Sequence, residues 1–270
     1  MARVVAIALA SVVATAAAGR AADATGDTAD SAELAKKLQN PIADLISVPF
    51  QSNFEWGAGP QSDGFNYTLN FQPVIPIPLT EDWNVISRTI IPVIHQDDLV
   101  PGTSQGGMGD IVQSFFFSPR KPGPAGLIWG VGPVLLLPTS TEDFLGAQKF
   151  GMGPTGVVLR QHSGWTYGLL FNHLVSIGGT RSTSDVNATF LQPFLSYTTK
   201  TYTTFGVNTE STYDWENSKW TVPLNPFVSQ LVKLGGQPVS FLLGPKWYAE
   251  GPTAAPDWGL RFAVTLLFPR

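Results

Sequence analysis

The chain has 270 residues, no cysteine and a formal net charge of −4 at pH 7. The lack of cysteine excludes a disulfide framework and thiolate chemistry, and the acidic balance argues against nucleic-acid binding, which needs a basic surface. Charged residues make up only 13% of the chain, about half the share of a typical soluble domain, whereas hydrophobic residues make up an ordinary 43%.

Residues 1–18 have the layout of a secretory signal peptide. Arg3 supplies a short positive region, the segment up to residue 18 is apolar, and Ala16-Ala17-Ala18 offers small residues for cleavage before Gly19. We therefore expect the protein to be exported, with cleavage here or a few residues later, near Ala21.

Residues 19–44 are expected to form a periplasmic leader with one short helix. The segment 21–30 is small and acidic, which is typical of a flexible leader. A helix is predicted over residues 31–39, with Ser31 as its N-cap, Leu34 and Leu38 on one face, and Pro41 beyond its end.

From residue 45 onward, apolar and polar residues alternate with the period of a β-strand. In the last such segment Phe262 and Phe268 belong to the apolar face, and Arg261 and Thr265 belong to the polar face. This pattern is typical of the strand that closes a barrel in the bacterial outer membrane. It also explains the composition, because half the residues of such a strand can face lipid without any long apolar run.

We therefore predict an all-β fold, a transmembrane antiparallel up-and-down β-barrel of about 12 strands over residues 45–270, preceded by the short N-terminal helix. The predicted strands span residues 46–56, 65–77, 83–95, 110–118, 127–137, 152–161, 165–177, 187–197, 201–212, 220–232, 239–249 and 257–268.

The predicted connections fall into two groups by length. Short ones include residues 79–82, 162–164 and 198–200, and long polar ones include residues 96–109, 138–151 and 178–186. Short periplasmic turns with longer extracellular loops are typical of outer-membrane barrels. Tryptophan and tyrosine residues near the predicted strand ends are expected to form the aromatic girdles at the two membrane interfaces.

Prolines inside several predicted strands conflict with a closed barrel, which has no edge strand to accommodate them. We predict β-bulges or bends at these positions, with neighbouring amide side chains bonded to free backbone carbonyls. The alternative is that some strand boundaries are misplaced. The positions are Gln72-Pro73, Gln192-Pro193, Asn225-Pro226, Gly132-Pro133, Gly153-Pro154 and Gly244-Pro245.

Four segments also resemble a known bacterial family. They are residues 34–51 (beginning LAKKLQNP), 83–94 (WNVISRTIIPVI), 109–114 (GDIVQS) and 129–159 with its loop PTSTED. The family is named for the meta-pathway of phenol degradation, and its members are often labelled "transporter" or "neuromedin U". The resemblance implies an outer-membrane barrel that passes small compounds, aromatic ones among them.

Two motifs suggest chemistry, but neither has the context that chemistry needs. The run from Gly102 to Gly106 fits the G-x-S-x-G pattern of hydrolases, yet no strand-to-helix turn surrounds it. His95, Asp97 and Asp98 lie close together, but a zinc site usually needs at least three ligands in a fitting geometry. We therefore expect no catalytic residues, no metal site and no cofactor.

Polar residues on the inward face of the strands are the candidate site, because charge on a lipid-facing surface is costly. Ion pairing with one another and contact with a solute are both open for each of them. The lumen-lining candidates are Glu55, Gln72, Arg88, Asn172, Gln192, Asn208, Glu210, Asn225, Lys246 and Arg261. Glu142 and Asp143, in the second long loop, are candidates for a constriction at the pore mouth.

The function predicted from these features is an outer-membrane channel for passive passage of small solutes, with aromatic or hydrophobic compounds as candidates. A closed structural barrel and a lipid-modifying outer-membrane enzyme are the alternatives. The expected partners are outer-membrane lipid, a small-molecule solute, and periplasmic chaperones with the barrel-assembly machinery of a Gram-negative cell; no nucleic acid is expected.

Overall fold

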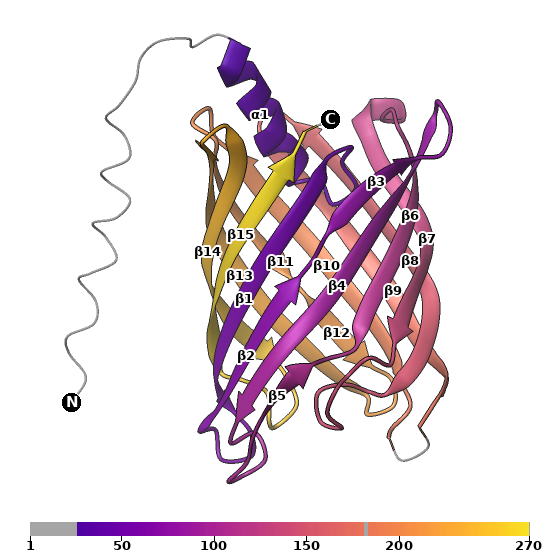
Figure 1. Cartoon of the computed structure of the whole chain (residues 1–270), viewed down its shortest axis with the longest axis vertical. Helices are drawn as coiled ribbons and strands as arrows, with labels where there is room; N and C mark the ends of the chain where they lie inside the picture. The colour runs from indigo at the N-terminus through magenta and orange to yellow at the C-terminus, as the bar shows by residue number, and fades with distance from the viewer. Residues whose placement is uncertain (1–25, 181–182, 270) are drawn as a thin grey trace, which may run out of the picture.

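The computed structural model describes residues 26–180 and 183–269. Over these residues one helix precedes antiparallel strands that close into a barrel (Figure 1). The predicted signal peptide, residues 1–18, lies outside the described residues. The elements are α1 (Gly26–Leu38), β1 (Ile46–Ala58), β2 (Gly64–Phe71), β3 (Val74–Pro78), β4 (Trp83–Asp97), β5 (Ser104–Met108), β6 (Ile111–Pro119), the 3-10 helix η1 (Pro124–Gly126), β7 (Leu127–Leu137), β8 (Lys149–His162), β9 (Trp165–Gly179), β10 (Asn187–Thr198), β11 (Thr203–Thr209), β12 (Ser211–Asp214), β13 (Lys219–Leu234), β14 (Gln237–Glu250) and β15 (Trp258–Phe268).

The first and last strands pair with each other and close the wall. β1 lies antiparallel to β15 from Ile46 opposite Phe268 to Trp56 opposite Trp258. Three pairs of short strands, β2 with β3, β5 with β6 and β11 with β12, each occupy one position in the wall. Within the described residues the barrel therefore has 12 strand positions, and the predicted fold class is confirmed.

The predicted strand spans agree with the structure except near residue 100. The segment 96–109, expected as a loop, contains β5, which pairs with the end of β4 from Asp97–Ser104 to Val93–Met108. Its glycine-rich sequence carries no clear alternation, but a ladder needs only backbone N–H and C=O groups.

The helix also differs from its prediction. Among the described residues α1 begins at Gly26, so Ser31 lies inside the helix and is not its N-cap. An acidic composition, which by itself predicts a flexible leader, also favours the first turns of a helix because of the helix dipole. Leu34 and Leu38 share one face as predicted, and Leu34 is buried.

The connections differ in length between the two ends of the barrel. At the end that carries α1, called the helix end, they cover residues 79–82, 120–126, 163–164, 199–202 and 235–236. At the opposite end, called the loop end, they cover residues 59–63, 98–103, 138–148, 180–186, 215–218 and 251–257. The longest connection, residues 138–148, is at the loop end, as the predicted asymmetry requires.

Glycine followed by proline interrupts the ladders without shifting their register. A Cβ added to Gly132, Gly153 or Gly244 would overlap a backbone carbonyl oxygen of the neighbouring strand. Around Gly153 the β8–β9 pairs stop after Met152–Val175 and resume at Thr155–Asn172 in the same register. The predicted β-bulges are therefore wrong here, because glycine lets the neighbouring strand approach where proline offers no N–H.

The predicted role of the amide side chains is also wrong where the structure tests it. The Gln72 Oε1 atom accepts a hydrogen bond from Arg88 at 3.0 Å, and Asn225 Nδ2 donates to Asn208 Oδ1 at 3.0 Å. Both amides point inward, where polar side chains rather than wall carbonyls are their neighbours. The chain does break its strand at Gln72-Pro73, between β2 and β3.

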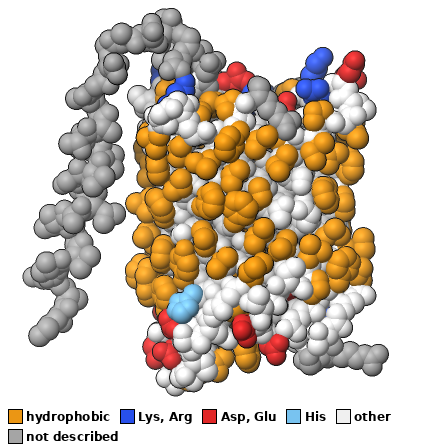
Figure 2. All heavy atoms as spheres, in the orientation of Figure 1, with side chains coloured by type: hydrophobic (Ala, Val, Ile, Leu, Met, Phe, Trp, Pro, Cys, Tyr) orange, Lys and Arg blue, Asp and Glu red, His pale blue; other side chains and the backbone are white. Residues whose placement is uncertain are grey.

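The two faces of the wall differ in polarity. In β15 Arg261 and Thr265 are buried inside the barrel, whereas Phe262 and Phe268 are each 40% exposed on the outer surface. Figure 2 shows apolar side chains across the middle of the visible outer face, with charged side chains at the two ends. Among the described helices none is long and apolar enough to cross a membrane.

Substitution of Gly153 by alanine tests the close approach of β8 and β9. The added Cβ must displace the His173 carbonyl, so we expect Gly153→Ala to lower the free energy of unfolding by about 1–3 kcal/mol. The matched control is Gly178→Ala, since nothing lies within 4 Å of a Cβ there. Urea unfolding of the refolded barrel in detergent measures both; equal stabilities would contradict the close approach.

Candidate functional site

A bidentate ion pair crosses the barrel interior between distant strands. Arg261 faces inward because it alternates with Leu260 and Phe262, which belong to the outer face of β15. Its Nη1 and Nη2 atoms donate to Glu210 Oε1 and Oε2 at 2.9 and 2.6 Å, and its Nε donates to Asn53 Oδ1 at 2.9 Å. Glu210 lies between β11 and β12, and β13 and β14 separate it from β15 along the wall. The ion pair therefore connects β15 with the β11–β12 part of the wall directly through the barrel interior.

A second cluster centres on Glu55 of β1. Lys246 Nζ and the Tyr248 hydroxyl both donate to Glu55 Oε1, and Asn66 Nδ2 donates to Glu55 Oε2 at 2.7 Å. Lys246 and Glu55 are both almost fully buried. Each charge in this cluster has an opposite partner, and the remaining carboxylate oxygen is also bonded. This is the arrangement that makes a buried ion pair structurally tolerable.

Gln72, Arg88 and Gln192 stand where three interior cavities meet. The cavities have volumes of about 170, 240 and 320 Å³, and all three residues line each of them. The smallest lies toward the helix end beside Leu38 and Pro41, and the largest also includes Asn172 and Glu210. The three side chains thus form the junction of a chain of cavities along the barrel.

The predicted inward residues occupy three groups. The first, Gln72, Arg88, Asn172, Gln192 and Glu210, lines the 320 Å³ cavity. The second, Asn208, Asn225 and Arg261, lines the 240 Å³ cavity together with members of the first. The third, Glu55 and Lys246, forms the closed cluster described above. Asn53, Asn66 and Tyr248, which bind these charges, were not predicted, although each lies in phase with the polar face of its strand.

Part of the interior is apolar, which the sequence did not predict. Near the helix end Ile86, Phe116 and Leu170 are 0–1% exposed, and they pack with Val157, Leu159 and Ile42. Alternation does not distinguish an apolar residue that faces inward from one that faces outward. The one feature of the sequence that indicated inward apolar residues is that Ile86 and Ile90 share the phase of Arg88.

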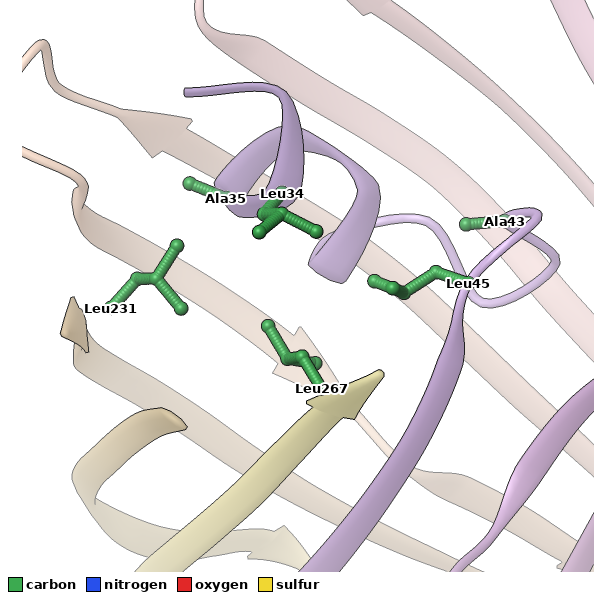
Figure 3. Close-up of a cluster of buried hydrophobic side chains, with 6 residues drawn as sticks. All are labelled: Leu34, Ala35, Ala43, Leu45, Leu231 and Leu267. Atoms are coloured by element: carbon green, nitrogen blue, oxygen red, sulfur yellow. The ribbon is translucent and has the colours of Figure 1, made fainter. Parts of the chain in front are cut away.

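The helix α1 and the turn behind it cover the helix end of the barrel. Figure 3 shows Leu34 and Ala35 of the helix facing Leu231 of β13, Leu267 of β15 and Leu45. On the opposite side of the mouth Gln161 Nε2 of β8 donates to the Lys36 carbonyl at 2.8 Å. Contacts on both sides place the helix across the mouth.

The turn after α1 inserts Ile42 into the apolar part of the interior. Asn40 Oδ1 accepts the Ile42 backbone N–H at 3.0 Å, an Asx turn that reverses the chain. Ile42 is 5% exposed and packs with Phe116 and the cluster around it. We call residues 31–45 the plug, because this segment occupies the helix-end mouth.

Asp110 fixes the longest connection at the loop end. Its Oδ1 accepts the backbone N–H groups of Thr139 and Ser140, and its Oδ2 accepts those of Ala147 and Gln148. Glu142 and Asp143 are exposed at the tip of this loop, and Asp143 Oδ1 accepts a hydrogen bond from the Gln148 amide at 2.6 Å. Neither lines the three interior cavities, so their role in a constriction stays a prediction.

The hydrolase-like motif lies in the β4–β5 hairpin. Asp97 accepts hydrogen bonds from both His95, at 3.0 Å, and Ser104. The carboxylate stands between serine and histidine, whereas a serine nucleophile needs the histidine in that place. Among the described residues no group of three or more His, Cys, Asp or Glu could hold a metal ion.

The ion pair between Arg261 and Glu210 should contribute measurably to stability. Arg261→Met leaves a carboxylate that is only 24% exposed without its bonded counter-charge, with only the more distant Lys246 and Arg88 to compensate, so we expect a loss of about 3 kcal/mol. The double variant Arg261→Met/Glu210→Gln should lose less, and urea unfolding of the four proteins gives the coupling. A surface control is Glu33→Gln, which breaks the exposed pair with Lys37 and should cost about 0.5 kcal/mol or less. A coupling energy near zero between the substitutions at Arg261 and Glu210 would contradict a stabilising ion pair.

Comparison with known proteins supports the fold. No family model and no curated protein matches the chain. Among solved structures it is similar to the crystal structure of an outer membrane channel from Pseudomonas putida F1, with a TM-score of 0.63 and 14% sequence identity. The match covers 83% of this chain and 94% of that one. At this identity the likeness shows the fold alone, and the resemblance to the phenol-degradation family stays a prediction.

Proposed function

We propose that the protein is an outer-membrane channel for the passive passage of small solutes. The observation that carries this proposal is the inverted polarity of the barrel, which has an apolar outer surface and a polar interior with a chain of cavities. A soluble barrel would have the opposite arrangement. The similar barrel from Pseudomonas putida F1 is an outer membrane channel, which supports the same role here.

Aromatic side chains mark two levels on the outer surface. At the loop end Trp56 stacks on Trp258, with ring centroids 4.5 Å apart. At the helix end Trp83 packs edge-on against Trp129, with centroids 5.9 Å apart. Two such girdles flank the apolar band of outer-membrane barrels. In this proposal the helix end faces the periplasm and the longer loops face outward.

In this proposal the plug narrows the channel at rest. Cavities occupy the middle of the barrel, while the plug and the apolar cluster narrow its periplasmic mouth and leave smaller spaces beside the helix. Movement of the plug would widen this mouth, and the apolar lining around Ile42 and Phe116 suits the hydrophobic or aromatic solutes predicted from the sequence. A closed structural barrel is the alternative that this narrowing favours, and conductance separates the two.

A charge placed under α1 should open the channel. Ala35 is 2% exposed in the cluster below the helix, so Ala35→Asp must move the helix away to hydrate its carboxylate. We expect single-channel conductance in a planar bilayer to rise several-fold over that of the unaltered mature protein. Ala32→Asp is the matched control, because Ala32 is exposed on the same helix and should leave conductance unchanged.

Heat-modifiable migration on a gel confirms first that each variant has folded into a barrel. A folded Ala35→Asp barrel that passes no current would contradict the channel and leave the structural barrel as the better account. Equal currents from Ala32→Asp and Ala35→Asp would contradict the plug but not the channel.

A further inference from the structure

Arg88 is a charged side chain of the barrel interior whose hydrogen-bond partner is neutral. Its Nη2 atom donates to Gln72 Oε1 at 3.0 Å, and no carboxylate among the described residues lies within ion-pair distance of it, although Glu210 attracts it at longer range. The other interior cations differ: Arg261 binds Glu210 on two atoms, and Lys246 binds Glu55. Arg88 thus stands out as the interior cation that lacks a direct counter-charge.

The charge around the two larger cavities does not balance. Their charged lining residues are Arg88, Glu210 and Arg261. Glu210 gives both carboxylate oxygens to Arg261, so this pair is satisfied internally. One positive charge is left, on the partly buried Arg88 guanidinium, which Glu210 attracts from a distance but does not pair with. A charge in such a place is stabilised when an anion accompanies it.

The 320 Å³ cavity beside Arg88 has both polar and apolar walls. Its polar wall carries the charges of Arg88 and Glu210, the latter held by Arg261, and its other wall is apolar. The remaining polar residues are Gln51, Asn70, Gln72, Ser114, Asn172, Gln192 and Thr212. The apolar residues are Ile90, Val112, Leu174, Ala188 and Phe190. A volume of about 300 Å³ is at the lower end of the range for small-molecule sites. The cavity therefore fits a small molecule with one charged end and an apolar body.

We propose that Arg88 is the anchor of a binding site for small monocarboxylates with an apolar body. The planar guanidinium matches a carboxylate on two atoms, which a neutral hydroxyl cannot reproduce. Gln192 and Asn172 hydrogen-bond the carboxylate from the side, and Ile90, Val112 and Phe190 contact the body. This site gives the proposed channel its solute class, and the inference rests on that function only for passage, because binding is measured without current.

Calorimetric titration of the unaltered mature protein in detergent tests the site with three probes that share one ring. Benzoate is an anion, benzyl alcohol is neutral and benzylamine is a cation. We expect benzoate to bind at least about tenfold more tightly than either of the others. Acetate, which has the charge without the body, should also bind at least about tenfold more weakly than benzoate. Equal binding of benzoate and benzyl alcohol would overturn the proposal.

Variants then assign the binding to Arg88. Arg88→Gln should weaken benzoate binding about tenfold or more, and Arg88→Lys should lie between, because it keeps the charge and loses the planar fork. The matched control is Arg160→Gln, which removes the same charge from the exposed face of β8 and should bind benzoate normally. Unchanged binding by folded Arg88→Gln or Arg88→Lys would overturn the proposal; if neither folds, the probe comparison on the unaltered protein decides.

Conductance separates this proposal from the channel itself. Benzoate should partly block the current of the Ala35→Asp barrel, and the block should disappear when Arg88→Gln is added. Binding that depends on Arg88 in a barrel without current would refute the channel and retain the site. Current without any benzoate binding or block would retain the channel and refute the site.

Discussion

Closure of the sheet between β1 and β15 is the constraint on which the rest of the structure depends. Once those strands pair from Ile46 to Trp56, no strand has a free edge, and every side chain must point either into the barrel or out of it. Alternate residues of each strand therefore face either the outer surface or the barrel interior. Phe262 and Phe268 are exposed on the outside for the same reason that Arg261, next to Phe262, is buried inside.

A closed wall also limits how proline can be accommodated. Without an edge, a residue that lacks an N–H leaves a gap in a ladder rather than lying at its margin. Glycine before proline resolves this, since the missing Cβ lets the next strand's carbonyl come close while the register stays the same, as at Gly153. A bulge would have moved every following side chain to the other face. Preserved register is therefore what keeps the inward residues of β8 inward on both sides of Pro154.

The sequence predicted the features that alternation reports and missed those that depend on three-dimensional neighbours. Strand spans, closure and the inward phase of Arg261 all follow from a period of two. The inward apolar cluster around Phe116 has the same period as the outward stripe, so alternation could not assign its face. The plug depends on Leu34 and Ala35 reaching Leu231 and Leu267, which are some 200 residues away in the chain. No local pattern carries such a contact.

Among the described residues, two ion pairs in the barrel interior connect separate strands, whereas the charged side chain of Arg88 does not. Pairs such as Glu55–Lys246 and Glu210–Arg261 tie β1 to β14 and β15 to the β11–β12 region, and their lone pairs and protons are largely used within the wall. Arg88 ties nothing to a distant strand; its partner Gln72 lies on the adjacent one. A partly buried guanidinium that contributes no cross-barrel pair adds little to stability. Arg88 lines all three cavities, and the binding of an anion there would explain why the charge is kept.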